Sequence, residues 1–233
     1  MFPFLTFCLS QKTKFKNTCI NKIRMIDFDA LKKEQIKLAG KVSIIDGVKK
    51  IKTVAGADQA YIDGKVISAI AVCDYKSMRL IENKYAVVEA KIPYKSGFLF
   101  YKDGPAIIEA FNKLENKPDV LIVEANGILH PRRIGMASHV GILLDTMTIG
   151  VTKALMLGQM IENTIYVDKE ARGYGLITRE HANPIYISPG YKISLKTSLE
   201  VIKKCIKVPH KLPEPLHLAR KHGNKIREKM MSE

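Results

Sequence analysis

The chain has 233 residues, 46% of them hydrophobic, and a formal net charge of +15 at pH 7. This length and composition suit one domain with a sizeable core, and the charge favours a polyanionic partner. The sequence contains no apolar stretch long enough to cross a bilayer as a helix, and its four cysteines lack CxxC spacing. We therefore expect a cytoplasmic protein without a membrane span, a zinc site or a disulfide framework.

The excess of positive charge lies at the two ends of the chain. Residues 1–24 contain five Lys or Arg and no acid, and residues 203–233 contain nine against three acids. A basic terminal segment is usually a solvated surface, so charge alone supports nucleic-acid binding only weakly. We expect residues 1–24 to be a disordered extension without a secretory signal, and residues 25–233 to form a single, monomeric domain.

The first half of the domain reads as a helix followed by an antiparallel meander. Residues 28–42 have apolar positions at helical spacing, and this helix should end near Gly40. Residues 52–62 and 65–75 are β-rich, and Asp63-Gly64 between them is a strong hairpin turn. Residues 79–90 supply a third strand.

The second half alternates between helix and strand. The pattern predicts a helix over 105–114, an apolar strand over 119–123, a helix over 134–145 and a short buried strand over 148–151. A further helix is expected over 195–206, entered from residues 188–190. Three antiparallel strands followed by alternating helix and strand predict an α/β fold with a mixed sheet covered by helices.

Three acids lie where such a sheet could bring them together. Asp58 is inside the first strand, Asp103 is where a loop leads into the predicted helix, and Glu124 follows an apolar strand. Carboxylates from separate elements hold the divalent metals that hydrolyse phosphodiesters at neutral pH. Each acid also has a structural interpretation: Asp103 before Gly-Pro could be a helix N-cap, Glu124 could mark a strand end, and Asp58 could face water.

Other candidate residues lie in three loops. Gly127 permits close approach of the backbone to a ligand, and the nearby His130 and Arg132 could bind phosphate or stabilise their own loop. Lys153 follows a buried strand and is either a site cation or a surface lysine. Tyr94, in a loop that also contains Gly97, could stack on bases or simply pack against the protein.

Taken together, these segments resemble endonuclease V from about residue 31 to residue 220. Six blocks occur in the family's order, and the third is similar to the family's most specific motif. The blocks are residues 54–58 (VAGAD), 93–99 (PYKSGFL), 130–139 (HPRRIGMASH), 148–153 (TIGVTK), 186–190 (YISPG) and 212–215 (LPEP).

The resemblance implies a ribonuclease-H-like fold and Mg²⁺-dependent cleavage 3′ to deoxyinosine or inosine in DNA or RNA, with Mn²⁺ as a possible substitute. It implies that Asp58, Glu124 and Asp103 hold the metal and activate water, and that Lys153 steadies the scissile phosphate. It also implies that Tyr94 wedges the strand open beside Gly97, and that the loop at Gly127 receives the flipped base beside His130 and Arg132.

The chain departs from the family pattern around this site. Asp103 stands where the family has Glu, Glu124 where it has Asp, and Tyr191 where it usually has His. Residues 95–96 and Ala125 differ as well. A displacement of a ligand by about 1 Å can cost roughly 10²-fold in rate. Two other hypotheses therefore stand beside an active inosine-directed endonuclease: a protein that binds deaminated or branched nucleic acid but cuts it poorly, and a related nuclease for structured RNA.

Overall fold

The computed structural model describes residues 26–47 and 50–232, so the extension predicted at residues 1–24 lies outside the described part. The helices there are α1 (Phe28–Ala39), α2 (Leu99–Asn112), α3 (Met136–Leu144), α4 (Leu195–Cys205) and α5 (Glu214–Met231). The strands are β1 (Thr53–Ile62), β2 (Lys65–Asp74), β3 (Leu80–Glu89), β4 (Val120–Val123), β5 (Met147–Thr152), β6 (Gln159–Ile161), β7 (Thr164–Val167), β8 (Glu170–Leu176) and β9 (Ile185–Tyr191). None of the described helices is long and apolar enough to span a membrane.

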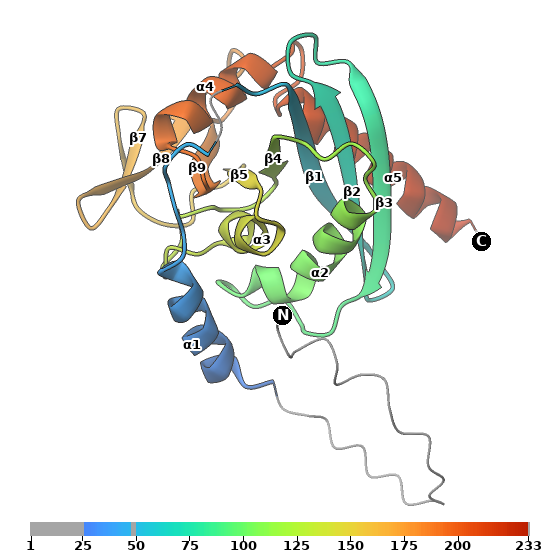
Figure 1. Ribbon diagram of the computed structural model, residues 1–233, viewed down its shortest axis with the longest axis horizontal. Helices are drawn as coiled ribbons and strands as arrows, with labels where there is room; N and C mark the ends of the chain where they lie inside the picture. The colour runs from blue at the N-terminus through green and yellow to red at the C-terminus, as the bar shows by residue number, and fades with distance from the viewer. Residues whose placement is uncertain (1–25, 48–49, 233) are drawn as a thin grey trace, which may run out of the picture.

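The strands form one mixed sheet in the order β3-β2-β1-β4-β5-β9-β8-β7-β6 (Figure 1). β1, β2 and β3 are an antiparallel meander, β1, β4 and β5 are parallel, and β9 returns antiparallel to β5. This is the predicted α/β architecture. Asp63 and Gly64 make the predicted hairpin turn because both adopt positive φ, 46° and 74°, as a tight two-residue turn requires.

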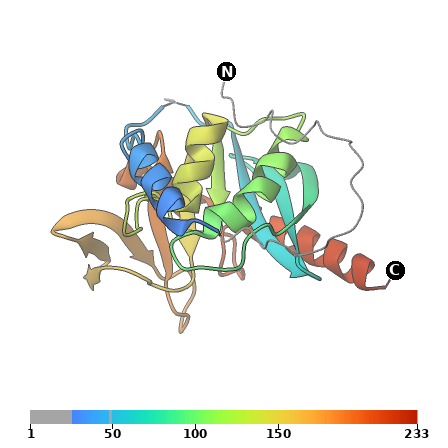
Figure 2. The same ribbon diagram turned by 90° about the horizontal axis from the view of Figure 1, so that it is seen from below.

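Helices cover both faces of the sheet, so the central strands are apolar on both sides (Figure 2). Ala55, Leu121 and Val123 face α2 and α3, whereas Val54 and Ile122 face α4 and α5. This alternation follows from the two-residue period of a strand. It also means that neighbouring residues at a strand end point toward different helices.

The structure corrects two predictions about element boundaries. The helix expected at 105–114 begins at Leu99, so Asp103 lies inside α2 and is not its N-cap. Two contacts stabilise the first turn of α2. Phe100 stacks on His139 with 3.5 Å between ring centroids, and the Tyr101 hydroxyl donates a hydrogen bond to the Leu31 carbonyl. Residues 188–190, expected to lead into a helix, instead lie within β9.

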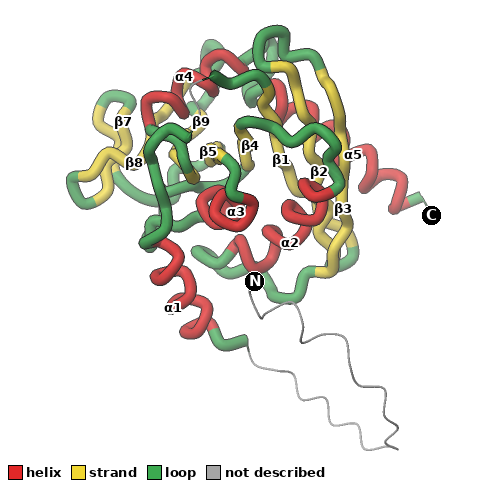
Figure 3. The backbone as a smooth tube through the Cα atoms, viewed as in Figure 1, coloured by secondary structure: helices red, strands yellow, loops and turns green. Residues whose placement is uncertain are grey.

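Two parts of the fold were not predicted. β6, β7 and β8 form an antiparallel extension at one edge of the sheet, drawn at the left of Figure 3. The basic C-terminal segment, expected to be a solvated surface, forms α5, whose side chains Leu216 and Ala219 are buried against the sheet. The described part of this segment is therefore a structural layer of the fold.

Candidate active site

The strand register brings Asp58, in the middle of β1, level with Glu124 and Lys153, which directly follow β4 and β5. Ala57 is paired with Val123 in the parallel β1–β4 ladder, and the Glu124 amide donates to the Ala57 carbonyl at 3.1 Å. Glu124 therefore lies beside Asp58. β5 continues the parallel order, and Lys153, directly after it, places Nζ 2.8 Å from Oε1 of Glu124.

A cation from the C-terminal helix joins the two carboxylates. Arg220 of α5 donates from Nε to Oδ2 and from Nη2 to Oδ1 of Asp58, both at 3.1 Å. The same Nη2 also donates to Oε2 of Glu124. Asp58 and Glu124 thus converge on one positively charged group, with Lys153 on the outer side of Glu124.

The two carboxyl groups differ in proton affinity. Burial raises the pKa of Asp58 to about 7, the neighbouring Glu124 adds to the rise, and Arg220 opposes it. Burial also acts to raise the pKa of Glu124, but Asp58, Arg220 and Lys153 together outweigh it, so this pKa is lowered. Two adjacent acids whose pKa values are pushed apart are typical of a functional site.

Asp103 does not join the other two acids. It is 1% exposed, and Oδ2 accepts a 2.6 Å hydrogen bond from the hydroxyl of Tyr61, while Lys102 Nζ lies 3.9 Å from Oδ1. Tyr61 points toward α2, whereas Asp58 on the same strand reaches α5. Among residues 26–47 and 50–232, no group of three or more His, Cys, Asp or Glu side chains could hold a metal.

Gly127 is held where a side chain could not fit. A Cβ there would overlap the Pro189 carbonyl oxygen, and the Gly127 amide donates to Oγ of Ser188 at 2.8 Å. The Ile128 amide donates to the same Pro189 carbonyl at 2.7 Å. The loop after Glu124 is therefore fixed on β9 at Ser188 and Pro189.

The carbonyl oxygen of Gly97 is a junction between three segments. It accepts hydrogen bonds from Nη2 of Arg132 at 2.6 Å, Nε2 of Gln35 at 3.0 Å and Nε2 of His130 at 3.2 Å. Nε of Arg132 also donates to Oε1 of Gln35 at 2.7 Å. Gly97 itself has a φ of 77°, which favours glycine. Arg132 therefore fastens the Tyr94 loop to α1.

His130 is neutral in this setting. Its Nδ1 accepts a hydrogen bond from the Arg132 amide, so Nε2 carries the proton that is donated to Gly97. Burial, with Arg132 adding to it, lowers the pKa of His130 to about 4. The sequence left two interpretations of His130 and Arg132, phosphate binding and stabilisation of their own loop. Their contacts match the second.

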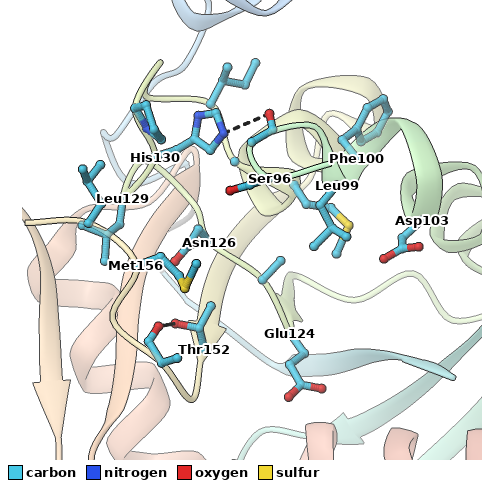
Figure 4. A pocket seen from close by; sticks show the side chains of 18 of the residues that line it. Ser96, Leu99, Phe100, Asp103, Glu124, Asn126, Leu129, His130, Thr152 and Met156 are labelled. Carbon is cyan, nitrogen blue, oxygen red and sulfur yellow. Dashed lines mark hydrogen bonds between the residues drawn. The ribbon is translucent and has the colours of Figure 1, made fainter. Parts of the chain in front are cut away.

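A pocket opens between these elements (Figure 4). Asp103 and Glu124 lie toward one side of it, and Leu129 and His130 lie toward the other. Tyr94, 64% exposed, lines the pocket from the loop before Gly97. The pocket is therefore bordered by two of the three acids, by the loop that contains Tyr94 and by the loop that follows Glu124.

Tyr191 lies far along the sheet from these residues. It pairs with Thr148 near the beginning of β5, whereas Lys153 follows the other end of that strand. Its hydroxyl donates to Oδ1 of Asp145 at 3.4 Å. The histidine expected at this position from the resemblance would therefore not reach the carboxylates in this structure.

Comparison with known proteins identifies the family of this chain. The family model described as Endonuclease V matches residues 36–221. An endonuclease V of Dictyoglomus thermophilum is 36% identical over 199 residues, which cover 82% of this chain and 87% of the relative. The chain belongs to the endonuclease V family.

Solved endonuclease V structures have the same fold. The Bacillus subtilis protein is 28% identical with a TM-score of 0.83, and the alignment covers 90% of this chain and 95% of that one. The Ciona intestinalis protein, in complex with a 24mer DNA containing an inosine followed by a ribo-adenosine, is 26% identical with a TM-score of 0.79, covering 87% and 98%. These neighbours confirm the predicted ribonuclease-H-like fold.

The sequence patterns did not identify three residues of this endonuclease V site. Arg220 lies in a run in which Leu216, Ala219 and Gly223 recur at helical spacing, a signal that could have placed one face of α5 on the sheet. Tyr61 could have been found only through its partner Asp103. Gln35, buried within the amphipathic α1, is an unusual polar position that indicates a tertiary contact.

Proposed function

We propose that the protein is a metal-dependent endonuclease that cleaves nucleic acid at a phosphodiester 3′ to deoxyinosine or inosine. Membership of the endonuclease V family supports nuclease activity. The observation that carries the proposal is the convergence of Asp58 and Glu124 on one cation beside Lys153. Solved members of the family in complex with inosine-containing DNA support the choice of substrate.

The donor atoms suit Mg²⁺, with Mn²⁺ as a substitute. Both are hard cations that prefer carboxylate oxygens, and Asp58 and Glu124 already direct their oxygens at one positive charge. We propose that these two acids hold the metal. When bound, such a metal activates water and neutralises charge on the phosphate.

The remaining residues have distinct proposed roles. Lys153, with Nζ near the acids and partly exposed, would bind the scissile phosphate. Asp103, which lines the same pocket as Glu124 and accepts a hydrogen bond from Tyr61, would position water or complete the acid cluster when substrate binds. Tyr94 would separate the strand, and the loop at Gly127 would receive the base that has left the stack.

The decisive test is a nicking assay. A labelled duplex with one deoxyinosine and its inosine-containing RNA counterpart are each incubated with the protein, with Mg²⁺ or with EDTA. We expect one cut 3′ to the modified base, only with Mg²⁺. Unmodified duplexes of the same sequence are the substrate controls, and structured RNA without inosine tests the nuclease of different specificity.

Asp58→Ala is the matched protein control. It should abolish cleavage while the far-UV circular dichroism and binding to the inosine duplex remain. Full activity in Asp58→Ala would refute the metal assignment. Binding without Mg²⁺-dependent nicking by the unaltered protein would refute the endonuclease and leave a protein that only recognises deaminated bases.

A further inference from the structure

Arg220 reaches the carboxylates because α5 is seated directly on β1. A Cβ at Gly56 would overlap the backbone of Pro215, so the first turn of α5 approaches β1 as closely as glycine allows. Leu216 and Ala219 are buried on the same face of the helix. Arg220, next on that face, is directed at Asp58, two residues after Gly56.

Cations of the chain itself engage every oxygen of the two acids. Nε and Nη2 of Arg220 donate to Oδ2 and Oδ1 of Asp58, and Nη2 also donates to Oε2 of Glu124. Nζ of Lys153 forms an ion pair with Oε1 of Glu124. The pair of carboxylates and the pair of cations balance in formal charge. A guanidinium that bridges two carboxylates in this way stands where a divalent cation shared by them would stand.

The geometry points to Arg220 as a built-in counter-ion that occupies the metal position of the free protein, so that a divalent metal binds only when this side chain swings out. Arg220 and the metal are like charges that use the same oxygens, and both cannot occupy the position at once. The side chain of Arg220 is 31% exposed, so it has a route to solvent. The inference rests on the proposed function only in taking Asp58 and Glu124 as the metal-binding acids.

Competition of this kind has a measurable consequence. The apparent affinity for metal falls by the fraction of molecules in which Arg220 has left the carboxylates. If that fraction is about one in ten or less, removal of the guanidinium raises the affinity about tenfold or more. A residue that merely stabilised the fold would leave the affinity unchanged, and one that helped to hold the metal would lower it.

The test is a titration of Mn²⁺ alone, without nucleic acid, followed by the loss of the free-ion electron paramagnetic resonance signal. Arg220→Gln is compared with the unaltered protein and with Lys221→Gln, which removes the same charge from an exposed position one residue along α5. We expect at least about tenfold tighter binding in Arg220→Gln and no more than about a twofold change in Lys221→Gln. Equal or weaker binding in Arg220→Gln would overturn the inference, as would tighter binding that persists in Arg220→Gln with Asp58→Ala.

A second measurement uses the unaltered protein, in case Arg220→Gln does not fold. The Nε–Hε resonance of Arg220, assigned with Arg220→Lys, is followed by NMR during a Mg²⁺ titration. It should move toward the position of a solvent-exposed arginine as the amides of residues 58 and 124 shift. An unmoved Arg220 resonance once those amides have finished shifting would overturn the inference. Neither titration depends on cleavage, so failure of the nicking assay and failure of this inference are separate results.

Discussion

The hydroxyl of Tyr61 donates a 2.6 Å hydrogen bond to Oδ2 of Asp103, whose Oδ1 is buried and accepts no hydrogen bond from the described residues. Burial raises the pKa of Asp103, while Tyr61 and then Lys102 act to lower it. The fold therefore keeps a poorly solvated acid on α2, beside the pocket. Such an arrangement costs stability and is typical of a residue retained for function.

Removal of the Tyr61 hydroxyl should cost more stability at neutral pH than in acid. A hydrogen bond to a charged group contributes about 1.5–3 kcal/mol and one to a neutral group about 0.5–1.5. Without the donor, the already raised pKa of Asp103 rises further, so Tyr61→Phe loses stability as pH increases through that pKa. Urea unfolding at pH 7 and pH 4 measures the difference, with Tyr166→Phe on β7 as control. An equal cost at both pH values would contradict the ionic character of this bond.

Arg132→Lys should loosen the Tyr94 loop. Lysine cannot donate to Gly97 and Gln35 together as the guanidinium does, so about 1–3 kcal/mol of unfolding free energy should be lost, with reduced nicking. The neighbouring Arg133 provides the control, because its pair with Glu170 is exposed and Arg133→Lys should cost about 1 kcal/mol or less. Similar losses in both variants would show that Arg132 has no special role.

Gly127→Ala should displace the loop from β9. The new Cβ would overlap the Pro189 carbonyl, which is backbone and cannot rotate away, so the variant should lose about 2 kcal/mol or more of stability and most of its cleavage. Gly40→Ala is the matched control, since its Cβ would meet only the Lys37 carbonyl at 3.6 Å. Thermal unfolding and the nicking assay report the two effects. An active, fully stable Gly127→Ala would mean that the loop adjusts freely.

His139 should make the protein acid-sensitive. Burial, and then His130, lower its pKa to about 3, whereas an unfolded histidine titrates near 6.5. The unfolded chain therefore binds a proton that the folded protein refuses, and stability is lost as pH falls from 6.5 toward 3. The stability advantage of the unaltered protein over His139→Gln should shrink by about 2–3 kcal/mol between pH 7 and pH 4.5. His181→Gln, at a side chain that is 91% exposed, is the control variant. A stability difference for His139→Gln that does not change between pH 7 and pH 4.5 would contradict the prediction.

Tyr94→Ala should change selectivity without changing stability. The side chain is largely exposed, so its loss should alter unfolding free energy by about 0.5 kcal/mol or less. If it wedges into the stack, the preference for inosine-containing over unmodified duplex should fall, as measured by the ratio of nicking rates. Ile45→Ala removes an exposed apolar side chain outside the pocket and should leave that ratio unchanged. An unchanged ratio in Tyr94→Ala would return this residue to a packing role.

Local patterns were sufficient for the meander and the parallel strands. Asp63-Gly64 determines its hairpin through backbone conformation alone, and the short apolar run before Glu124 is the buried strand that its length indicates. The start of α2 was mispredicted because Gly104-Pro105 has the local chemistry of a first turn. The stacking of Phe100 on His139, from a distant helix, overrides it. The short strands β6 and β7 carry too few residues for a periodic signal.

Only some residues of the candidate site could be predicted from the sequence. Three acids were expected to lie where a mixed sheet could bring them together, and two of them, Asp58 and Glu124, bind the same side chain, Arg220. Asp103 does not contact them, because it lies on α2 at the other face of β1, where Tyr61 donates a hydrogen bond to it. Arg220, 162 residues from Asp58, depends on how α5 lies across the sheet, and no local pattern encodes that angle.

The close contact between Gly56 and Pro215 makes the position of the Arg220 guanidinium depend on the backbone of β1. α5 touches this glycine in its first turn, and Arg220 lies about one and a half turns further along the same helix. A methyl group added at residue 56 would lift the near end of the helix and tilt the guanidinium relative to Asp58. An uncharged substitution that touches neither acid would thus change the strength with which Arg220 binds both.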